Sequence, residues 1–190
     1  MKEFRVTEIR ADVAAATGSL ILTGRPIVFD TPTTIHDPAG EYIEIIKSGS
    51  LDHADLSDVR LLYNHDLSKV PLARTPKTMQ LNVDQAGMTF TASLADTEEA
   101  RAIHEAVKRG DLSGMSFAFK VPDGGDTYNS LTNTREINRI EKVLECSVVP
   151  FPAYPTTSIE ARSLIASGLK NLEARKQSKL LINQIMKVRI

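Results

Sequence analysis

Residues 108 to 120 read Lys-Arg-Gly-Asp-Leu-Ser-Gly-Met-Ser-Phe-Ala-Phe-Lys, and they join the end of a helix to the start of a strand. Two cations followed by Gly110 are typical of a helix C-terminus, where cations favour the dipole and glycine adopts left-handed backbone angles. From Met115 onward, apolar side chains alternate with small or polar ones, which is the period of a half-buried strand. Ser116 therefore lies at a strand start, on the face opposite Met115 and Phe117. A serine held there is a candidate nucleophile, although most such serines only serve turns.

Composition predicts an ordinary soluble chain with one sizeable core, since 42% of its 190 residues are hydrophobic and 25% are charged. The net charge of -1 gives no electrostatic case for binding nucleic acid or an anionic membrane. One cysteine, Cys146, excludes an internal disulfide and a cysteine-based metal site. Because there is no signal-like N-terminus and no apolar run of membrane-spanning length, we expect the protein to be used where it is made.

Alternating apolar patterns predict that most of the chain is β structure. We expect strands at residues 4–9, 18–29, 41–46, 59–63, 79–84, 88–94, 115–120 and 135–149. Gly24 and Pro26 interrupt the second of these and predict a bulge, as in a curved sheet or barrel. Residues 30–40 and 122–134 are expected to be loops. The predicted fold class is α+β, mainly antiparallel β.

A helix is expected between Asp96 and Gly110. Acidic residues follow a capping residue at its start, and Ala100, Ile103 and Val107 form its buried stripe.

The proline-rich segment 150–155 predicts the end of the compact domain, which we assign to residues 1–156. Residues 157–190 contain no proline, and their apolar side chains recur every three or four positions, as in Ile165, Leu169 and Leu172. We expect one or two amphipathic helices in this C-terminal extension. They either pack on their own domain or bind a partner.

Three predicted strands carry the functional groups of a hydrolytic triad in His65, Ser116 and Glu145. A serine hydroxyl attacks a peptide carbonyl only when an imidazole takes its proton and a third group orients the ring. Each residue also has an ordinary interpretation: His65 as a strand-end histidine bonded to backbone, and Glu145 as half of a surface pair. Ser113 competes with Ser116 as the hydroxyl. Asp66 is expected to shape the turn after His65 rather than to orient its ring.

Three motifs, at residues 61–66 (Leu-Leu-Tyr-Asn-His-Asp), 108–119 and 144–155 (Leu-Glu-Cys-Ser-Val-Val-Pro-Phe-Pro-Ala-Tyr-Pro), occur together in this order. In this combination the chain resembles the prohead, or procapsid maturation, serine protease family of tailed bacteriophages. The resemblance extends from about Gly18 to Pro155. That family is similar to the herpesvirus capsid protease, which implies a twisted or closed antiparallel β-barrel with flanking helices.

The resemblance implies a role for each candidate. The histidine of the family's Asn-His-Asp motif falls on His65 as general base, and the motif serine falls on Ser116 as nucleophile, which favours Ser116 over Ser113. The glutamate of the Glu-x-Ser-Val motif falls on Glu145 as third member. Glu141 lies on the same predicted strand face and stays open as an alternative.

Arg74 matches a family position near the site, which implies a part in positioning substrate or oxyanion. The family glycine before it is replaced here by Ala73. The other histidines, His36, His53 and His104, fall in a loop, a turn and a helix, and we expect none of them to be a triad partner.

The resemblance implies a serine endopeptidase of phage head maturation that needs no cofactor and no metal. Its substrates would be the scaffold, extensions of the major capsid protein and the chain itself, inside the assembling prohead in the host cytoplasm. Contact with a second copy, as a dimer or in autoprocessing, is also implied. Residues 157–190 would then be a packaging or self-cleavage segment.

Two other functions remain open at this point. One is a non-catalytic capsid-assembly or scaffolding module on the same fold. The other is a metal hydrolase using His65 and Asp66, although no histidine pair has ligand spacing.

Overall fold

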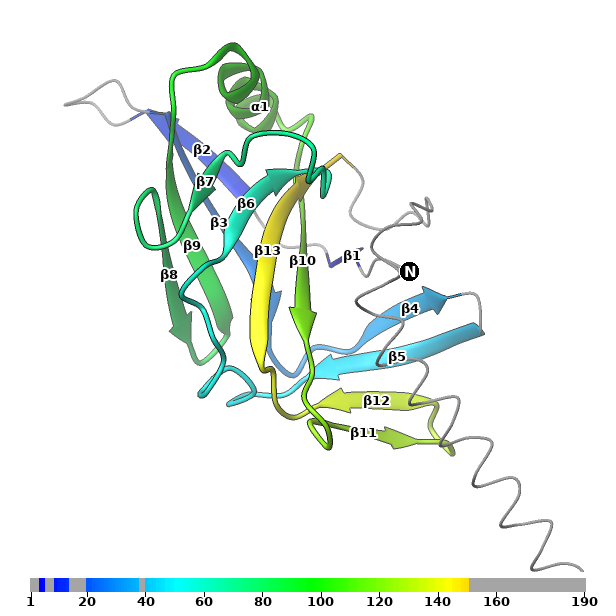
Figure 1. Cartoon of the computed structure of the whole chain (residues 1–190). Helices are drawn as coiled ribbons and strands as arrows, with labels where there is room; N and C mark the ends of the chain where they lie inside the picture. The colour runs from blue at the N-terminus through cyan, green and yellow to red at the C-terminus, as the bar shows by residue number, and fades with distance from the viewer. Residues whose placement is uncertain (1–3, 6–8, 14–19, 38–39, 151–190) are drawn as a thin grey trace, which may run out of the picture. The chain divides into compact units, whose positions relative to one another are not determined.

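The computed structural model of the protein describes residues 4–5, 9–13, 20–37 and 40–150. Within these residues there are fourteen elements, of which thirteen are strands and one is a helix (Figure 1). The predicted C-terminal extension at residues 157–190 lies outside the described residues, as does the predicted domain end at residue 156. The helix within the described part is too short to cross a membrane.

The described strands form three sheets. The first sheet contains, in spatial order, β1 (Phe4–Arg5), β10 (Gly114–Lys120), β13 (Lys142–Val149), β6 (Arg60–Tyr63) and β7 (Ala73–Arg74). The second contains β2 (Ile9–Val13), β3 (Leu20–Val28), β9 (Gly87–Leu94) and β8 (Met79–Asp84). The third contains β11 (Asp126–Asn129), β12 (Thr134–Ile137), β5 (Gly40–Ile46) and β4 (Thr33–Asp37). Most neighbours are antiparallel, but β13 runs parallel to β6 and β12 runs parallel to β5.

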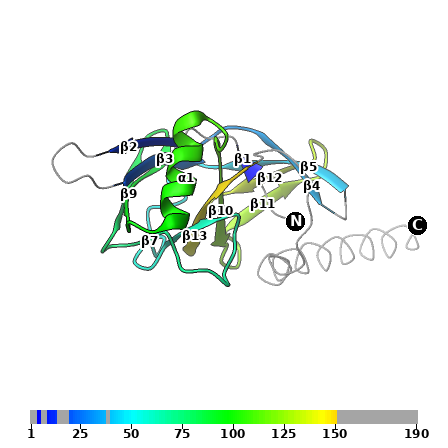
Figure 2. The same cartoon turned by 90° about the horizontal axis from the view of Figure 1, so that it is seen from above.

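This architecture agrees with the α+β, mainly antiparallel prediction. The predicted closed barrel is not seen among the described strands, because their hydrogen-bonded pairings form three separate sheets and no ring. In place of several flanking helices, the described part contains α1 (Glu98–Arg109), which packs against β2 and β3 (Figure 2).

Capping interactions at both ends of α1 confirm the helix prediction. The Thr97 hydroxyl accepts a hydrogen bond from the backbone N–H of Ala100 at 3.2 Å, which pairs one of the free amides of the first turn. Gly110 ends the helix with φ of 83° and donates to the carbonyls of the last turn. The buried side chains of α1 are the three predicted ones and one more: Ala100, Ile103, Val107 and His104.

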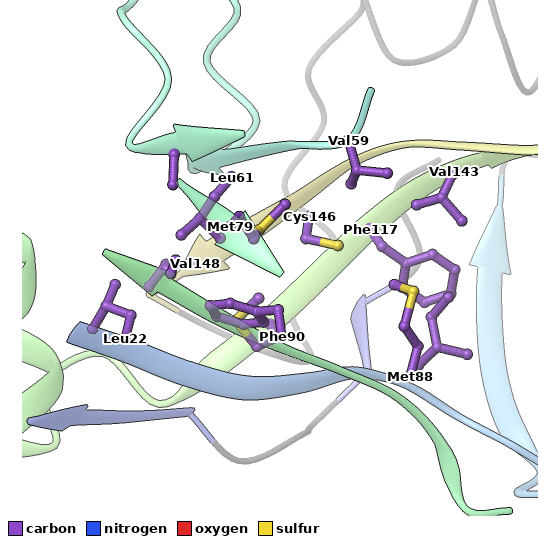
Figure 3. Close-up of a cluster of buried hydrophobic side chains, with 14 of the residues drawn as sticks. Leu22, Val59, Leu61, Met79, Met88, Phe90, Phe117, Val143, Cys146 and Val148 are labelled. Carbon is purple, nitrogen blue, oxygen red and sulfur yellow. The ribbon is translucent and has the colours of Figure 1, made fainter. Parts of the chain in front are cut away.

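A hydrophobic core fills the space between the first and second sheets (Figure 3). Phe90 and Leu22 of the second sheet face Phe117, Cys146 and Val148 of the first, and all five are at least 93% buried. Burial at this level contributes about 1.5–3 kcal/mol for each large apolar side chain. The core therefore fixes which face of β10 and β13 points inward, and the opposite face carries their polar side chains.

A bulge in β13 decides which of its side chains share a face. The register pairs Glu145 with one residue of β10 and Val143 with the next, so that Leu144 is skipped. The bulge lets Val143 enter the core although Glu145, two residues later, lies on the opposite face. Ser147 follows the alternation after the bulge and shares the face of Glu145.

The strand prediction was wrong in several places. Residues 33–37, within an expected loop, form β4, because they pair with β5. Residues 126–137, also expected to be mostly loop, form the β11–β12 hairpin. The predicted strand 135–149 is two strands in different sheets. It breaks where the backbone N–H groups of Asn138 and Arg139 turn to the carbonyl of Gly125, at 2.8 and 2.9 Å.

Candidate active site

His65 lies in a tight turn directly after β6. Asn64 and His65 both have left-handed backbone angles, with φ of 50° and 58°. Two hydrogen bonds attach this turn to β13: the Asn64 N–H donates to the Val148 carbonyl at 2.9 Å, and the His65 N–H donates to the Ser147 hydroxyl at 3.1 Å. The turn therefore brings the His65 side chain back over the neighbouring strand.

The imidazole of His65 contacts the carboxylate of Glu145. His65 Nδ1 and Glu145 Oε1 are 2.5 Å apart, and the two side chains are only 6% and 9% exposed. A carboxylate accepts hydrogen bonds and does not donate them, so Nδ1 is the donor in this contact and Nε2 is the ring nitrogen left to accept a proton. This is the tautomer that a general base needs in order to take a proton at Nε2.

The second oxygen of the same carboxylate binds Ser147. The Ser147 hydroxyl donates to Glu145 Oε2 at 2.5 Å, and Ser147 is fully buried. Glu145 therefore has one oxygen on the histidine ring and the other on a serine two residues along its own strand. Ser147 was not among the residues predicted from the sequence; the signal was its place two residues after Glu145, which puts both side chains on one strand face.

Ser116 lies on β10, directly opposite Ser147 in the antiparallel register. Facing residues of such a pair have Cβ atoms about 4.5–5.5 Å apart, on the same side of the sheet. The backbone of β6 lies two strand spacings from β10, about 10 Å. Because the His65 ring reaches back to Glu145 on the intervening strand, it covers part of that distance toward Ser116.

The site is closed in this structure. Ser116 is 1% exposed, and the side chains of His65 and Glu145 are also buried. A polypeptide therefore reaches the Ser116 hydroxyl only if part of the surroundings is displaced.

The remaining predicted residues lie in different settings. Glu141 is exposed and precedes β13, where its carbonyl accepts from the N–H of Asp55 at 2.8 Å. Ser113 is exposed just before β10. Asp66 shapes the turn, as predicted, since its carboxylate accepts from the N–H and the hydroxyl of Ser68 at 2.9 and 2.6 Å.

Arg74 lies at the end of β7, two strands away from Glu145 across Arg60. Its side chain is 52% exposed, and its guanidinium forms a 3.1 Å ion pair with Asp58. At ordinary strand spacing, about 10 Å separates the backbones of Arg74 and Glu145. The structure thus puts Arg74 on the sheet that carries the site, but not in contact with the His65–Glu145 pair.

Burial raises the pKa of the Cys146 thiol well above its ordinary value, and the neighbouring charge of Glu145 acts in the same direction. Cys146 is therefore a neutral thiol that packs in the core. In the described part of the chain, no group of three His, Cys, Asp or Glu side chains is placed to hold a metal ion.

A comparison with protein families adds an independent finding. The profile of the caudovirus prohead serine protease family matches residues 5–173 of the chain. The chain belongs to this family. No curated protein and no solved structure matches the chain.

Membership confirms the resemblance drawn from the three motifs, because the match includes all of them. It also supports a general function for the chain, that of a serine peptidase acting in phage head maturation. A carboxylate that holds an imidazole by Nδ1 is one of the features that acyl transfer to a serine requires.

Proposed function

We propose that this chain is the serine endopeptidase of phage head maturation, with Ser116 as nucleophile, His65 as general base and Glu145 as the acid that orients the histidine. The observation that carries the proposal is the 2.5 Å contact between His65 Nδ1 and Glu145 Oε1. Burying an ionisable pair costs desolvation free energy, and such pairs are concentrated at functional sites. The position of this pair one strand from a buried serine favours use in catalysis.

The reaction that these groups support is acyl transfer in two steps. Ser116 Oγ attacks the scissile carbonyl while His65 Nε2 takes the hydroxyl proton, and Glu145 stabilises the imidazolium that forms. When the C–N bond breaks, His65 gives that proton to the departing amine and leaves an ester on Ser116. Water then attacks the ester with the same histidine as base, which releases the acid and restores the hydroxyl.

Backbone N–H groups near Ser116 are proposed to bind the oxyanion, with each donor contributing about 3 kcal/mol to the transition state. For Arg74, a role in positioning substrate or oxyanion stays a prediction. Its exposure and its ion pair with Asp58 favour contact with a substrate chain over contact with the oxyanion.

We infer polypeptide substrates from the family: the scaffold, extensions of the major capsid protein, and the chain itself, within the assembling prohead of the host cytoplasm. The herpesvirus-like barrel and a self-cleaved or packaging extension at residues 157–190 belong to this proposal as well. These finer points rest on the resemblance.

The test is coexpression of the chain with the capsid gene product encoded beside it, followed by mass analysis of both polypeptides. Wild-type protein should shorten the capsid product, and Ser116→Ala should leave it at full length. Ser113→Ala is the matched control, because Ser113 is an exposed serine three residues earlier, and this variant should cleave normally. If the Ser116→Ala protein processes the capsid product as the wild type does, the assignment is wrong. If the wild type only binds the product, the scaffolding alternative is favoured.

A further inference from the structure

We propose that Ser147 is a positioning residue, which uses its single hydroxyl to hold both His65 and Glu145 in the geometry that proton transfer requires. This inference rests on the proposed function of the same site. Ser147 is fully buried on β13, and its hydroxyl makes one hydrogen bond to each of the two residues.

The hydrogen bond to Glu145 fixes the rotation of the carboxylate. The terminal torsion of a glutamate is broad, so one contact to His65 would leave the carboxylate plane poorly defined. With Oε1 on His65 Nδ1 and Oε2 on the Ser147 hydroxyl, both at 2.5 Å, the plane is set by two points. The oxygen that faces the imidazole then stays in one orientation.

The second hydrogen bond fixes the backbone that carries the histidine. A non-glycine residue with positive φ is strained, and two in succession persist only where the surroundings hold them. The His65 N–H donates to Ser147 Oγ at 3.1 Å, beside the bond from Asn64 N–H to the Val148 carbonyl. These two anchors attach the strained turn to the strand that bears Glu145, so the base and the acid move together.

Ser147 is poorly placed to be the nucleophile itself. Its proton is donated to a carboxylate, and it accepts a backbone amide, so attack on a substrate would break both hydrogen bonds. Ser116 lies opposite it on the neighbouring strand and needs neither of those contacts. The two serines can therefore be separated by experiment.

The chain offers a matched control in Ser50. Its hydroxyl is as deeply buried as that of Ser147, but it has no hydrogen-bond partner within the described residues. Removing such a hydroxyl leaves no partner unsatisfied, so the Ser50→Ala protein should keep wild-type behaviour. The Ser50→Ala variant therefore measures how much the deletion of a buried serine hydroxyl by itself changes the stability and the labelling rate.

The experiment uses a fluorophosphonate probe on the full chain, with the saturating labelling rate (kinact) and the probe affinity (KI) measured separately. We expect Ser147→Ala to lower kinact about ten- to hundred-fold, because small misplacements of catalytic groups cost this much. KI should stay unchanged, since the hydrogen bonds of the Ser147 hydroxyl go to His65 and Glu145. Ser147→Thr keeps the hydroxyl and should restore much of the rate, and Ser50→Ala should label as the wild type does.

Proton NMR supplies a readout that a merely structural role would not move. The wild type should show a low-field Nδ1–H resonance from the short bond to Glu145, assigned by its loss in His65→Gln. In Ser147→Ala this resonance should shift upfield or broaden, while thermal unfolding stays cooperative. If the threonine variant does not fold, the comparison of Ser147→Ala with Ser50→Ala still decides.

Two results would overturn the inference. One is a Ser147→Ala protein with wild-type kinact and an unmoved low-field resonance. The other is mass mapping of the label in the wild type to Ser147. Failure of the proposed function looks different: the wild type would not be labelled at Ser116, or Ser116→Ala would label equally well.

Discussion

At the scale of residues, the candidate site is a set of polar side chains kept on one face of a sheet whose other face forms the core. Glu145 and Ser147 alternate with Cys146 and Val148, so adjacent residues belong in turn to the proposed site and to the core. A one-residue slip in register would turn the polar side chains into the core and the apolar ones out of it.

Glu145 and Glu141 provide a direct comparison of two carboxylates that the sequence left as alternatives. We expect Glu145→Gln to lower the rate of probe labelling by on the order of 10³, because a neutral amide cannot stabilise the imidazolium. Glu141→Gln should have no effect, since Glu141 is exposed outside β13. Labelling kinetics of both variants check the assignment, and the reverse order of effects would contradict it.

Cys146 should not react in the folded protein. Its pKa is raised by burial and then by Glu145, so the nucleophilic thiolate is scarce and inaccessible. Iodoacetamide should leave the native chain unmodified at mildly alkaline pH and should modify it fully in denaturant, as measured by intact mass. Rapid alkylation of the native chain would contradict this prediction, because it would show that the Cys146 thiol is accessible.

At the scale of elements, two of the sheets depend on local irregularities. The bulge at Leu144 separates Val143 from Glu145, and β3 changes register with β9 between Gly24 and Ile27. Gly24 and Pro26 predict the irregularity in β3. The bulge at Leu144 contains no glycine or proline, so the sequence does not predict it. A bulge formed by ordinary residues depends on the partner strand, which periodicity along one strand does not report.

Gly87 begins β9, where its backbone passes very close to β3. A Cβ atom at this position would lie 2.0 Å from the Ile27 carbonyl oxygen, and φ is 144°. We expect Gly87→Ala to lower the free energy of unfolding by about 3 kcal/mol or more.

Gly110 is the control for backbone strain alone, because it also has positive φ but a Cβ atom added there would have nothing within 4 Å. Gly110→Ala should cost about 1 kcal/mol. Denaturant titrations of both variants test this, and equal losses would show that the close approach at Gly87 is not the cause.

Asp84 at the end of β8 gives the second sheet a dependence on pH. Hydrogen bonds from the Arg25 guanidinium, followed by those from the Ala86 and Gly87 N–H groups, lower the pKa of Asp84 to about 2. Because the unfolded-state pKa is higher, near 3.9, this contribution to stability is complete above about pH 4 and is lost as pH falls toward 2.

The free energy of unfolding of Asp84→Asn should therefore change less steeply across this acid range than that of the wild type. The difference should shrink in high salt, since the Arg25–Asp84 ion pair is partly exposed. Parallel pH profiles for the two proteins would contradict the assignment.

At the scale of the whole molecule, the sequence predicts what depends on local signals and misses what depends on distant partners. Thr97 and Gly110 marked α1 at both ends, because caps act within one turn. In contrast, the sequence predicts one strand for β12 and β13, although each pairs in parallel with a different strand about 80 to 90 residues earlier in the chain. The alternation of apolar and polar residues is the same in β12 and β13, and it does not indicate which strand each of them pairs with.

The candidate site follows the same division. Motifs indicate His65, Ser116 and Glu145, which the chain separates by 29 to 80 residues, but they do not indicate how the fold places these residues relative to one another. Their placement depends on the strand order β10–β13–β6, and this order puts Ser147 in contact with His65 and Glu145 and opposite Ser116. A residue whose role is to join others is visible only once the sheet is assembled.

The central claim is that Ser116 is the nucleophile activated by the His65–Glu145 pair. Peptide mass mapping of the purified chain after fluorophosphonate treatment tests this most directly. We predict the label on Ser116 in the wild type, no label in Ser116→Ala, and strongly slowed labelling in His65→Ala. A label on another residue, or equal labelling of folded Ser116→Ala, would contradict the claim.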